Sequence, residues 1–382
     1  MRVAIVSDLT KWAWAGCEEL WAALAQKALE RGDKVAVYLC RETARPNKVQ
    51  PLVDRGLDLH LPGTAAKLVN RTRRVSWKLW NYLAPLGSPF ATLPKFSPTV
   101  LFFNAVDTIP NPILLKQLRR TGALGLPYVI MCQNSHLFDR PVEGVDREEA
   151  VRFYQGARLV LSAAERTNAE IQHQLGVKLN RMRVIRNPVN IRDFSVIPMP
   201  IGSTVGIASL GRMAVNSKGQ DMLLAALGGS DLRQHDWRLS FYGEGPDVNH
   251  LMLLAKHYGI SDRVSVKGYE NDIRVVWAEN HLLALPSRVE SCPLVMVEAM
   301  LCGRTCVAND VGGVTDWISE PDTGFVSPGL NIASFQKALQ RAWSAKPDWT
   351  AIGMRAHDKA QKAIDPDPGG TILKFLDEIS AK

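Results

Sequence analysis

Two cations six positions apart, Arg212 and Lys218, are the residues best suited to chemistry in this chain. An arginine fork beside a lysine point charge suits a diphosphate, and glycines such as Gly211 and Gly219 let the backbone approach such a ligand closely. Taken alone, both cations could be solvated residues at the start of a helix. Their position beside glycines, directly after an expected strand, favours a diphosphate ligand.

Two carboxylates eight positions apart form a second candidate group. Pro293 suits the first turn of a helix that runs to about Leu301, and the free amides at such a helix start favour phosphate oxygens. Glu290 lies just before this helix, and Glu298 lies among its apolar residues. A buried carboxylate requires a partner or a ligand. Because carboxylates accept hydrogen bonds from paired hydroxyls, a sugar and a ribose are suitable ligands.

The elements expected to position these residues are the strands of the second half of the chain. Alternating apolar and helix-like stretches predict strands near 204–209, 237–242, 263–266, 281–285 and 304–308. Ligands of open α/β sheets bind beyond the carboxyl ends of the strands. Arg212, Gly243, Gly268, Glu290 and Gly312 follow these strands, so they are expected to share one rim.

The first half of the chain shows the same alternation, with strands near 3–6, 35–39, 57–60, 99–103, 127–131 and 157–161. This predicts a parallel sheet with helices on both faces. A proline-containing stretch, 197–202, suits a connector. We therefore expect two doubly wound, Rossmann-like α/β domains, 1–197 and 198–365, facing a central cleft. A last helix within 366–382 could pack on either domain.

The second half resembles the retaining nucleotide-sugar glycosyltransferases of family 4, which have the GT-B fold. The resemblance spans most of residues 200–330 and is weaker in the first half. Asp316 stands where the family more usually has Glu. The residues that carry the resemblance are Arg212 and Lys218, the stretch Glu290-Ser-Cys-Pro-Leu-Val-Met-Val-Glu298, Gly303, and Gly312-Gly313 followed by Asp316.

The resemblance implies a role for each of the four charged residues. Arg212 and Lys218 would bind the donor diphosphate and stabilise charge on the leaving group. Glu290 would hold hydroxyls of the transferred sugar, and Glu298 would hold the ribose.

The resemblance also implies contacts from the main chain and from the first domain. Leu294 would offer its backbone amide to a phosphate, and the backbone around Gly268 and Tyr269 would frame the base. Gly16 would approach the phosphates, although its stretch, Ala-Gly-Cys-Glu, keeps one of the two glycines usual in the family. His136 follows an expected strand, where the family often has a His near the transferred sugar; a structural His is the alternative.

The expected chemistry needs neither a glycosidase-like carboxylate pair nor a metal ion. No two carboxylates stand out as acid and nucleophile. In the family, the departing phosphate is usually proposed to take the acceptor proton on the same face. The cationic side chains supply what a magnesium ion would, so the nucleotide diphosphate-sugar is expected as a co-substrate without any further cofactor.

The basic excess of the chain lies in its first half. Residues 1–197 carry 28 Lys and Arg against 17 Asp and Glu, a net charge of +11, whereas residues 198–382 carry 18 against 21, a net charge of −3. Cations and aromatic residues cluster within 67–82, on an expected helix, 66–83. Such a helix could contact an anionic membrane or a phosphorylated acceptor, and a solvated face is the equal alternative. Nucleic acid is not expected, because no binding motif for it is present.

The cysteines and the hydropathy pattern indicate a compartment. The six cysteines show no CxxC pair and no His partner at metal-ligand spacing, so neither a zinc site nor a disulfide framework is expected. The start lacks a signal-peptide core, and no stretch approaches the roughly 18 apolar residues of a membrane span. We expect a cytoplasmic protein that could meet the inner face of the membrane peripherally.

The sequence thus predicts a retaining, metal-independent glycosyltransferase of the hexosyltransferase type. It would transfer a sugar from a nucleotide diphosphate-sugar to a glycan, lipid-linked or phosphorylated acceptor, in the biosynthesis of cell-envelope polysaccharide or glycoconjugates. One alternative is another GT-B enzyme, such as a sugar epimerase or a phosphorylase. The other is an inert sugar-nucleotide-binding subunit.

Overall fold

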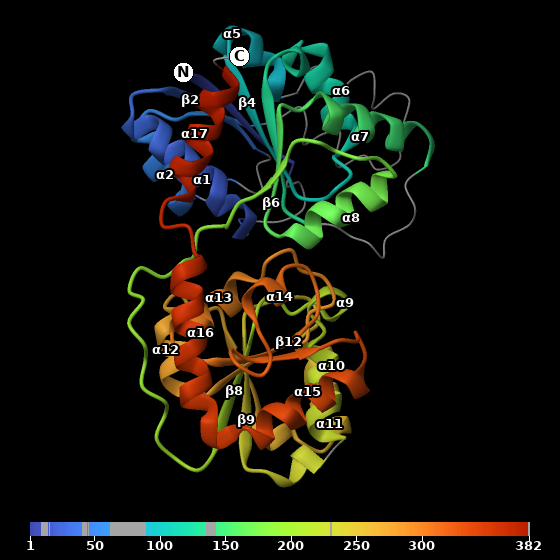
Figure 1. Ribbon diagram of the computed structural model, residues 1–382, viewed down its shortest axis with the longest axis vertical. Helices are drawn as coiled ribbons and strands as arrows, with labels where there is room; N and C mark the ends of the chain where they lie inside the picture. Colours follow the sequence, from blue (N-terminus) through green and yellow to red (C-terminus); the bar gives the residue numbers. More distant parts are fainter. Residues whose placement is uncertain are drawn as a thin grey trace. The chain divides into compact units, whose positions relative to one another are not determined.

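The computed structural model describes residues 1–8, 14, 16–39, 44, 46–61, 89–134, 143–229 and 231–380. The chain divides into two units, each built on a parallel sheet (Figure 1). Unit 1 comprises Met1–Pro188 together with Asp365–Lys382, and unit 2 comprises Val189–Ile364.

The sheet of unit 1 has seven parallel strands within the described residues, in the order β3-β2-β1-β4-β5-β6-β7. Its central strands are apolar and buried over most of their length, as expected for a sheet covered on both faces. The strands are β1 (Arg2–Ser7), β2 (Lys34–Tyr38), β3 (Asp58–His60), β4 (Val100–Ala105), β5 (Tyr128–Cys132), β6 (Leu159–Ser162) and β7 (Met182–Val184).

Helices alternate with these strands along unit 1, as the sequence predicts. The longest, α1, packs Leu20, Trp21 and Leu24 into the core, while its polar face stays outside. The helices are α1 (Gly16–Glu30), α2 (Pro46–Val53), α5 (Leu93–Phe96), α6 (Pro112–Arg120), α7 (Gly144–Gly156), α8 (Glu165–Leu175) and α17 (Pro368–Ser380).

The sheet of unit 2 has six parallel strands within the described residues, in the order β10-β9-β8-β11-β12-β13. Its strands are β8 (Val205–Leu210), β9 (Trp237–Tyr242), β10 (Val264–Gly268), β11 (Leu282–Leu285), β12 (Thr305–Asn309) and β13 (Phe325–Ser327). The strand order reverses between β8 and β11, and their carboxyl ends form the rim that the sequence predicts for a ligand.

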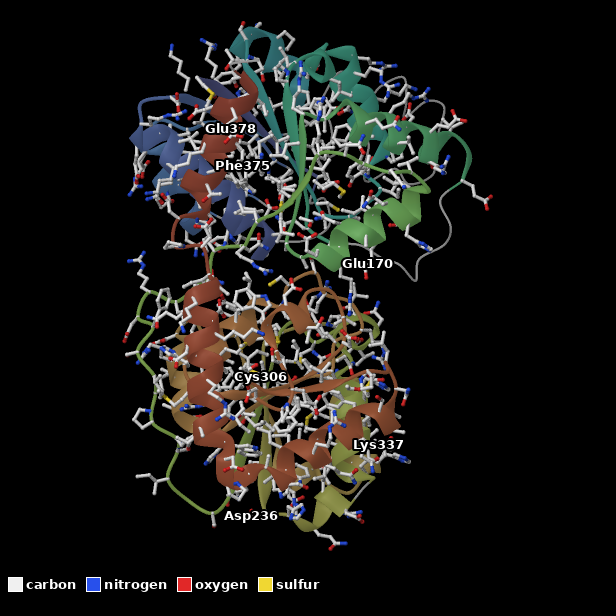
Figure 2. All side chains as sticks on the ribbon, in the orientation of Figure 1. Glu170, Asp236, Cys306, Lys337, Phe375 and Glu378 are labelled. Carbon is white, nitrogen blue, oxygen red and sulfur yellow. The ribbon has the colours of Figure 1, made fainter. Side chains whose placement is uncertain are left out.

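Helices pack on both faces of this second sheet. The buried apolar side chains of unit 2 form two separate clusters. Cys306 of β12, labelled in Figure 2, is fully buried in one of them. The two parallel, doubly wound sheets confirm the predicted fold class. The helices of unit 2 are α9 (Val215–Lys218), α10 (Gln220–Gly228), α11 (Val248–His257), α12 (Ile273–Glu279), α13 (Leu294–Leu301), α14 (Val314–Trp317), α15 (Ile332–Ser344) and α16 (Trp349–Ala363).

The last helix, α17, belongs to unit 1 and lies beside α1 (Figure 1). The guanidinium of Arg183 lies 4.9 Å from the ring centre of Phe375 and 3.6 Å from a carboxylate oxygen of Glu378, both of which Figure 2 labels on α17. Ile372 and Leu376 of the same helix are fully buried. The sequence left the partner of this helix open, because its apolar stripe does not say which surface covers it.

The chain passes from unit 1 to unit 2 after Pro188, earlier than the boundary expected after residue 197. The segment 189–200 carries the prolines that suggested a connector, but it packs on unit 2. Arg304, which is fully buried, donates hydrogen bonds to the carbonyl oxygens of Ile197 (2.7 Å) and Pro198 (2.8 Å). This contact joins residues more than 100 positions apart, so local sequence signals do not reveal it.

Two expectations fall on residues that lie outside the described part of the chain: the basic helix 66–83 and His136. Within the described part, none of the helices combines the length and the apolar character needed to cross a bilayer.

Candidate functional site

The loops that follow β8, β9 and β10 are held together through their backbones. The amide of Gly243 donates to the carbonyl of Gly268 (2.7 Å), and the amide of Gly211 donates to that of Tyr242 (2.9 Å). Gly243 has a φ of +132°, and a Cβ added there would lie 2.1 Å from the carbonyl oxygen of Gly211. Only glycine fits this position, so the glycines predicted at the strand ends let neighbouring loops approach closely.

Lys218 and Glu290 form an ion pair at the ends of β8 and β11. The Nζ of Lys218 lies 2.5 Å from Oε1 of Glu290, and the Oγ of Ser287 donates to the same oxygen at 2.8 Å. The carboxylate is largely buried, with its side chain 11% exposed, while that of Lys218 is 28% exposed. The two residues are 72 positions apart in sequence, and the structure brings them into direct contact as the shared rim predicts.

Gly219 allows the turn that carries Lys218 to close on the loop after β11. It ends α9 in the left-handed region, with a φ of +65°, and a Cβ there would lie 2.1 Å from the carbonyl oxygen of Pro286. Arg288 reinforces this junction by donating to both carboxylate oxygens of Asp221 (2.7 and 2.8 Å). Asp221 raises the pKa of Arg288. The sequence did not suggest this role for Arg288.

Arg212 lies in the loop between β8 and α9, the short helix whose last residue is Lys218. Its side chain is exposed, and its carbonyl oxygen accepts a hydrogen bond from Nε2 of Gln220 at 2.8 Å. Gly268 ends β10, and Tyr269, which follows it, is 68% exposed. These residues therefore lie at the carboxyl ends of β8 and β10, the two strands that flank β9.

Glu298 is buried on α13, where the sequence predicts a need for a partner. Its Oε1 accepts hydrogen bonds from the backbone amide (2.9 Å) and from Nδ2 (3.1 Å) of Asn190. Leu294 is the first residue of α13, so its amide lies in the turn where helical amides have no carbonyl four residues back. The amide of Gly313 donates to the carbonyl of Ser291 (2.6 Å), which ties the loop after β12 to the start of α13.

Unit 1 contains a buried polar network that the sequence did not suggest. Glu18, fully buried in the first turn of α1, accepts hydrogen bonds at Oε1 from Oγ of Ser7 (2.8 Å) and from Nδ2 of Asn104 (2.9 Å). Its Oε2 accepts a hydrogen bond from Nε1 of Trp21 at 2.7 Å. The network lies at the carboxyl ends of β1 and β4, the edge where a parallel sheet binds ligands.

The same network braces the first turn of α1, which begins at Gly16. The amide nitrogens of Asn104 and Gln133 each lie 3.3 Å from the carbonyl oxygen of Cys17. Gln133 also donates to Oδ1 of Asn104 (2.9 Å), and Nδ2 of Asn187 donates to Oε1 of Gln133 (3.2 Å). The sequence signal that could have revealed this network is a polar residue at or near the end of an apolar strand, Ser7 in β1 and Asn104 in β4.

The stability of the protein is expected to fall as the pH rises from about 4 to about 8 because of two buried carboxyls. Burial raises the pKa of Glu18 to about 7 and that of Asp8 to about 8. The folded state then holds protons that the unfolded state has released, so the stabilisation is complete at low pH and is lost through these two pKa values. Thermal unfolding followed at several pH values measures this slope.

The variant Glu18→Gln is expected to flatten the slope, because it removes one of the two titrating groups. Glu30→Gln, a change of an exposed carboxylate on the same helix, is the matched control and should keep the slope of the parent protein. A parent slope retained in Glu18→Gln would contradict the assignment.

A match to known proteins covers most of unit 2. Residues 204–345 match the model of the glycosyl transferases group 1. Over these residues the chain is similar to that family. The match includes Arg212, Lys218, Glu290 and Glu298, and it confirms the resemblance on which their predicted roles rest.

The chain is also similar to curated proteins whose names refer to polysaccharides. The chain is 31% identical over 176 residues to a lipopolysaccharide 1,6-galactosyltransferase of Escherichia coli, covering 44% of this chain and 47% of the relative. It is 29% identical over 198 residues to an exopolysaccharide phosphotransferase of Streptomyces coelicolor, covering 51% of this chain and 20% of the relative. The chain thus spans less than half the length of these two curated relatives.

Solved structures share the fold over the whole chain. HepE of Anabaena, crystallised in complex with UDP, matches with a TM-score of 0.76 and 16% identity, covering 99% of this chain and 100% of that one. The galactosyltransferase WaaB matches with a TM-score of 0.68 and 17% identity, covering 99% of both chains. At such low identity these matches show the fold alone, and the expected GT-B fold is confirmed.

Lys218 and Glu290 meet on the rim of unit 2, but not every predicted site residue lies in that unit. Glu298 contacts Asn190 within unit 2, whereas Gly16 lies in unit 1. Asp316, in α14, donates its amide to the carbonyl of Gly313 (3.1 Å).

Proposed function

We propose that the protein is a retaining, metal-independent glycosyltransferase of the hexosyltransferase type. It would move a sugar from a nucleotide diphosphate-sugar to an acceptor in the biosynthesis of cell-envelope polysaccharide or glycoconjugates. The observation that carries the proposal is the contact between Lys218 and Glu290 beyond the carboxyl ends of β8 and β11, inside the segment that matches the glycosyl transferases group 1.

In this proposal each member of the pair recognises a different part of the donor. Lys218, with Arg212 in the loop before α9, would neutralise the diphosphate as the bond to the sugar breaks. Glu290 would accept hydrogen bonds from sugar hydroxyls, since Ser287 and Lys218 already fix its Oε1. The donor would therefore replace part of the ion pair between Lys218 and Glu290. When the donor leaves, the two side chains would pair with each other again.

Other contacts to the donor would come from the remaining predicted residues. Glu298 would hold the ribose, Leu294 would give its amide to a phosphate, and Gly268 and Tyr269 would frame the base. Gly16 of unit 1 would approach the phosphates. His136 would lie near the transferred sugar.

Unit 1 is proposed to bind the acceptor. Its part of the sequence carries the basic excess, which suits an anionic acceptor such as a phosphorylated or lipid-linked glycan. The E. coli relative is named for its action on lipopolysaccharide, which agrees with this class of acceptor. The contact of residues 67–82 with an anionic membrane surface is part of the same proposal.

The protein is expected to bind a nucleoside diphosphate, and uridine is the base proposed, because HepE was crystallised with UDP and with UDP-glucose. Titration calorimetry with UDP, GDP and ADP measures this directly, and UDP should bind most tightly. Binding of none of the three would reject the donor hypothesis. Binding without release of UDP from any UDP-sugar in the presence of cell-envelope glycolipids would favour an inert nucleotide-binding subunit.

A further inference from the structure

The segment that leads into unit 2 contacts a residue of the proposed donor site. Asn190, the second residue of unit 2, directs both its backbone amide and its side-chain Nδ2 to the same oxygen of Glu298, at 2.9 and 3.1 Å. Two donors on one oxygen fix the rotation of a carboxylate, because each hydrogen bond has a preferred direction. These bonds join residues 108 positions apart.

Packing of α13 in the core of unit 2 restricts where the side chain of Glu298 can lie. Glu298 is 4% exposed, and its neighbours Val297, Ala299 and Met300 are fully buried in the core of unit 2. The backbone of α13 is thus fixed by packing, and the remaining variable is the orientation of the carboxylate. Hydrogen bonds to a charged group are among the stronger ones in proteins, so Asn190 has the means to set that orientation.

The segment that carries Asn190 is itself anchored on unit 2. The guanidinium of Arg274 donates to the carbonyl oxygens of Asp193 (3.0 Å) and Ser195 (2.9 Å). Arg304 holds the next stretch through the carbonyl of Ile197. The position of Asn190 is therefore fixed by the contacts of its segment, and its two donors can hold the carboxylate of Glu298 in one orientation.

We propose that Asn190 is a positioning residue, which orients the carboxylate of Glu298 toward the ribose hydroxyls of the donor nucleotide. This inference rests on the proposed function, and it adds a residue outside the matched segment 204–345 to the nucleotide site. Its consequence is that nucleotide affinity depends on the residue where the chain enters unit 2.

The test compares two variants of the same segment in the full-length protein. Asn190→Ala removes the side-chain donor and leaves the backbone amide, so its affinity for UDP should fall about fivefold to tenfold. Arg274→Ala loosens the segment but keeps both donors of Asn190, so its affinity for UDP should fall less than that of Asn190→Ala. Equal weakening in both variants would mean that the segment acts only as a structural support, and this would overturn the proposal.

A second ligand shows whether the loss of affinity in Asn190→Ala depends on the ribose hydroxyls. With 2′,3′-dideoxyuridine diphosphate, which lacks the hydroxyls, the parent protein and Asn190→Ala should bind equally. A loss of the same size with this ligand would overturn the proposal. The nearly isosteric variant Asn190→Asp replaces the donor by a second negative charge and should bind UDP more weakly than Asn190→Ala. Parent-like binding of UDP by Asn190→Asp would also overturn it.

The outcomes separate this inference from the proposed function. If the parent protein binds none of UDP, GDP and ADP, the proposed function fails and the inference fails with it. If the parent protein binds UDP and Asn190→Ala binds it equally well, the inference alone fails. Unfolding temperatures of the variants, measured alongside, should stay close to that of the parent protein.

Discussion

Replacing Lys218 by Ala is expected to reduce the release of UDP from UDP-glucose or UDP-galactose at least about a hundredfold. The ammonium group would stabilise charge that develops on the diphosphate as the bond to the sugar breaks, and no second lysine within the described rim contacts Glu290. The fold should remain intact, because the side chain of Lys218 is 28% exposed and does not pack into a hydrophobic core. Lys218→Arg should restore part of the rate, since it keeps the charge but changes its shape.

The matched control for this experiment is Lys256→Ala. Lys256 is an exposed lysine in the last turn of α11, so the change in net charge is the same, but the site is at the far end of a helix that leaves the rim. Its rate should equal that of the parent protein. Near-normal turnover in Lys218→Ala would reject the site assignment.

Replacing Arg304 by Met is expected to lower the stability of the protein by about 3–5 kcal/mol, because several buried carbonyls lose their donor and each unsatisfied buried polar group costs about 1–3 kcal/mol. The buried guanidinium donates to five backbone carbonyls, those of Trp277, Asn280, Cys302, Ile197 and Pro198. Burial lowers its pKa to about 10, so it stays charged at neutral pH. Met fills a similar space but leaves those carbonyls without their donor.

Thermal unfolding measures this loss, which corresponds to a fall of roughly 10 °C in the melting temperature of a unit of this size. Arg341→Met is the control: its guanidinium is 44% exposed and pairs with Glu320, so the loss should stay below about 1 kcal/mol. An Arg304→Met protein that melts with the parent would show that the carbonyls find other donors.

Much of the fold could be predicted from local patterns. The strand expected at 3–6 is β1, Arg2–Ser7, and the helix expected to end near Leu301 is α13. These predictions succeed because a strand buried on both faces must be apolar along its length, and Pro293 marks a helix start. The division at Pro188 was not predictable, because hydrogen bonds from Arg304, distant in sequence, decide which unit holds the connector.

The candidate site shows the same difference between local and distant information. The placement of Lys218 near Glu290 follows from parallel strands whose ends share a rim. The sequence predicted that Glu298 needs a partner or a ligand, but it could not identify Asn190 as that partner. A single Asn near a proline has many local uses, such as in turns. The network around Glu18 was missed for a related reason, since Asn104 and Gln133 are ordinary polar residues until the sheet brings them together.

The place of α17 has a consequence for the order in which the protein can fold during its synthesis. Most of unit 1 precedes unit 2 in the chain, yet its α1 is covered by α17, which is made after the whole of unit 2. Until then, the surface of α1 around Ala23, against which Gly369 packs, lacks its cover. Unit 2, which is continuous in sequence, can therefore complete its fold on the ribosome before unit 1 does. We expect the nascent unit 1 to depend on chaperones for longer than unit 2 does.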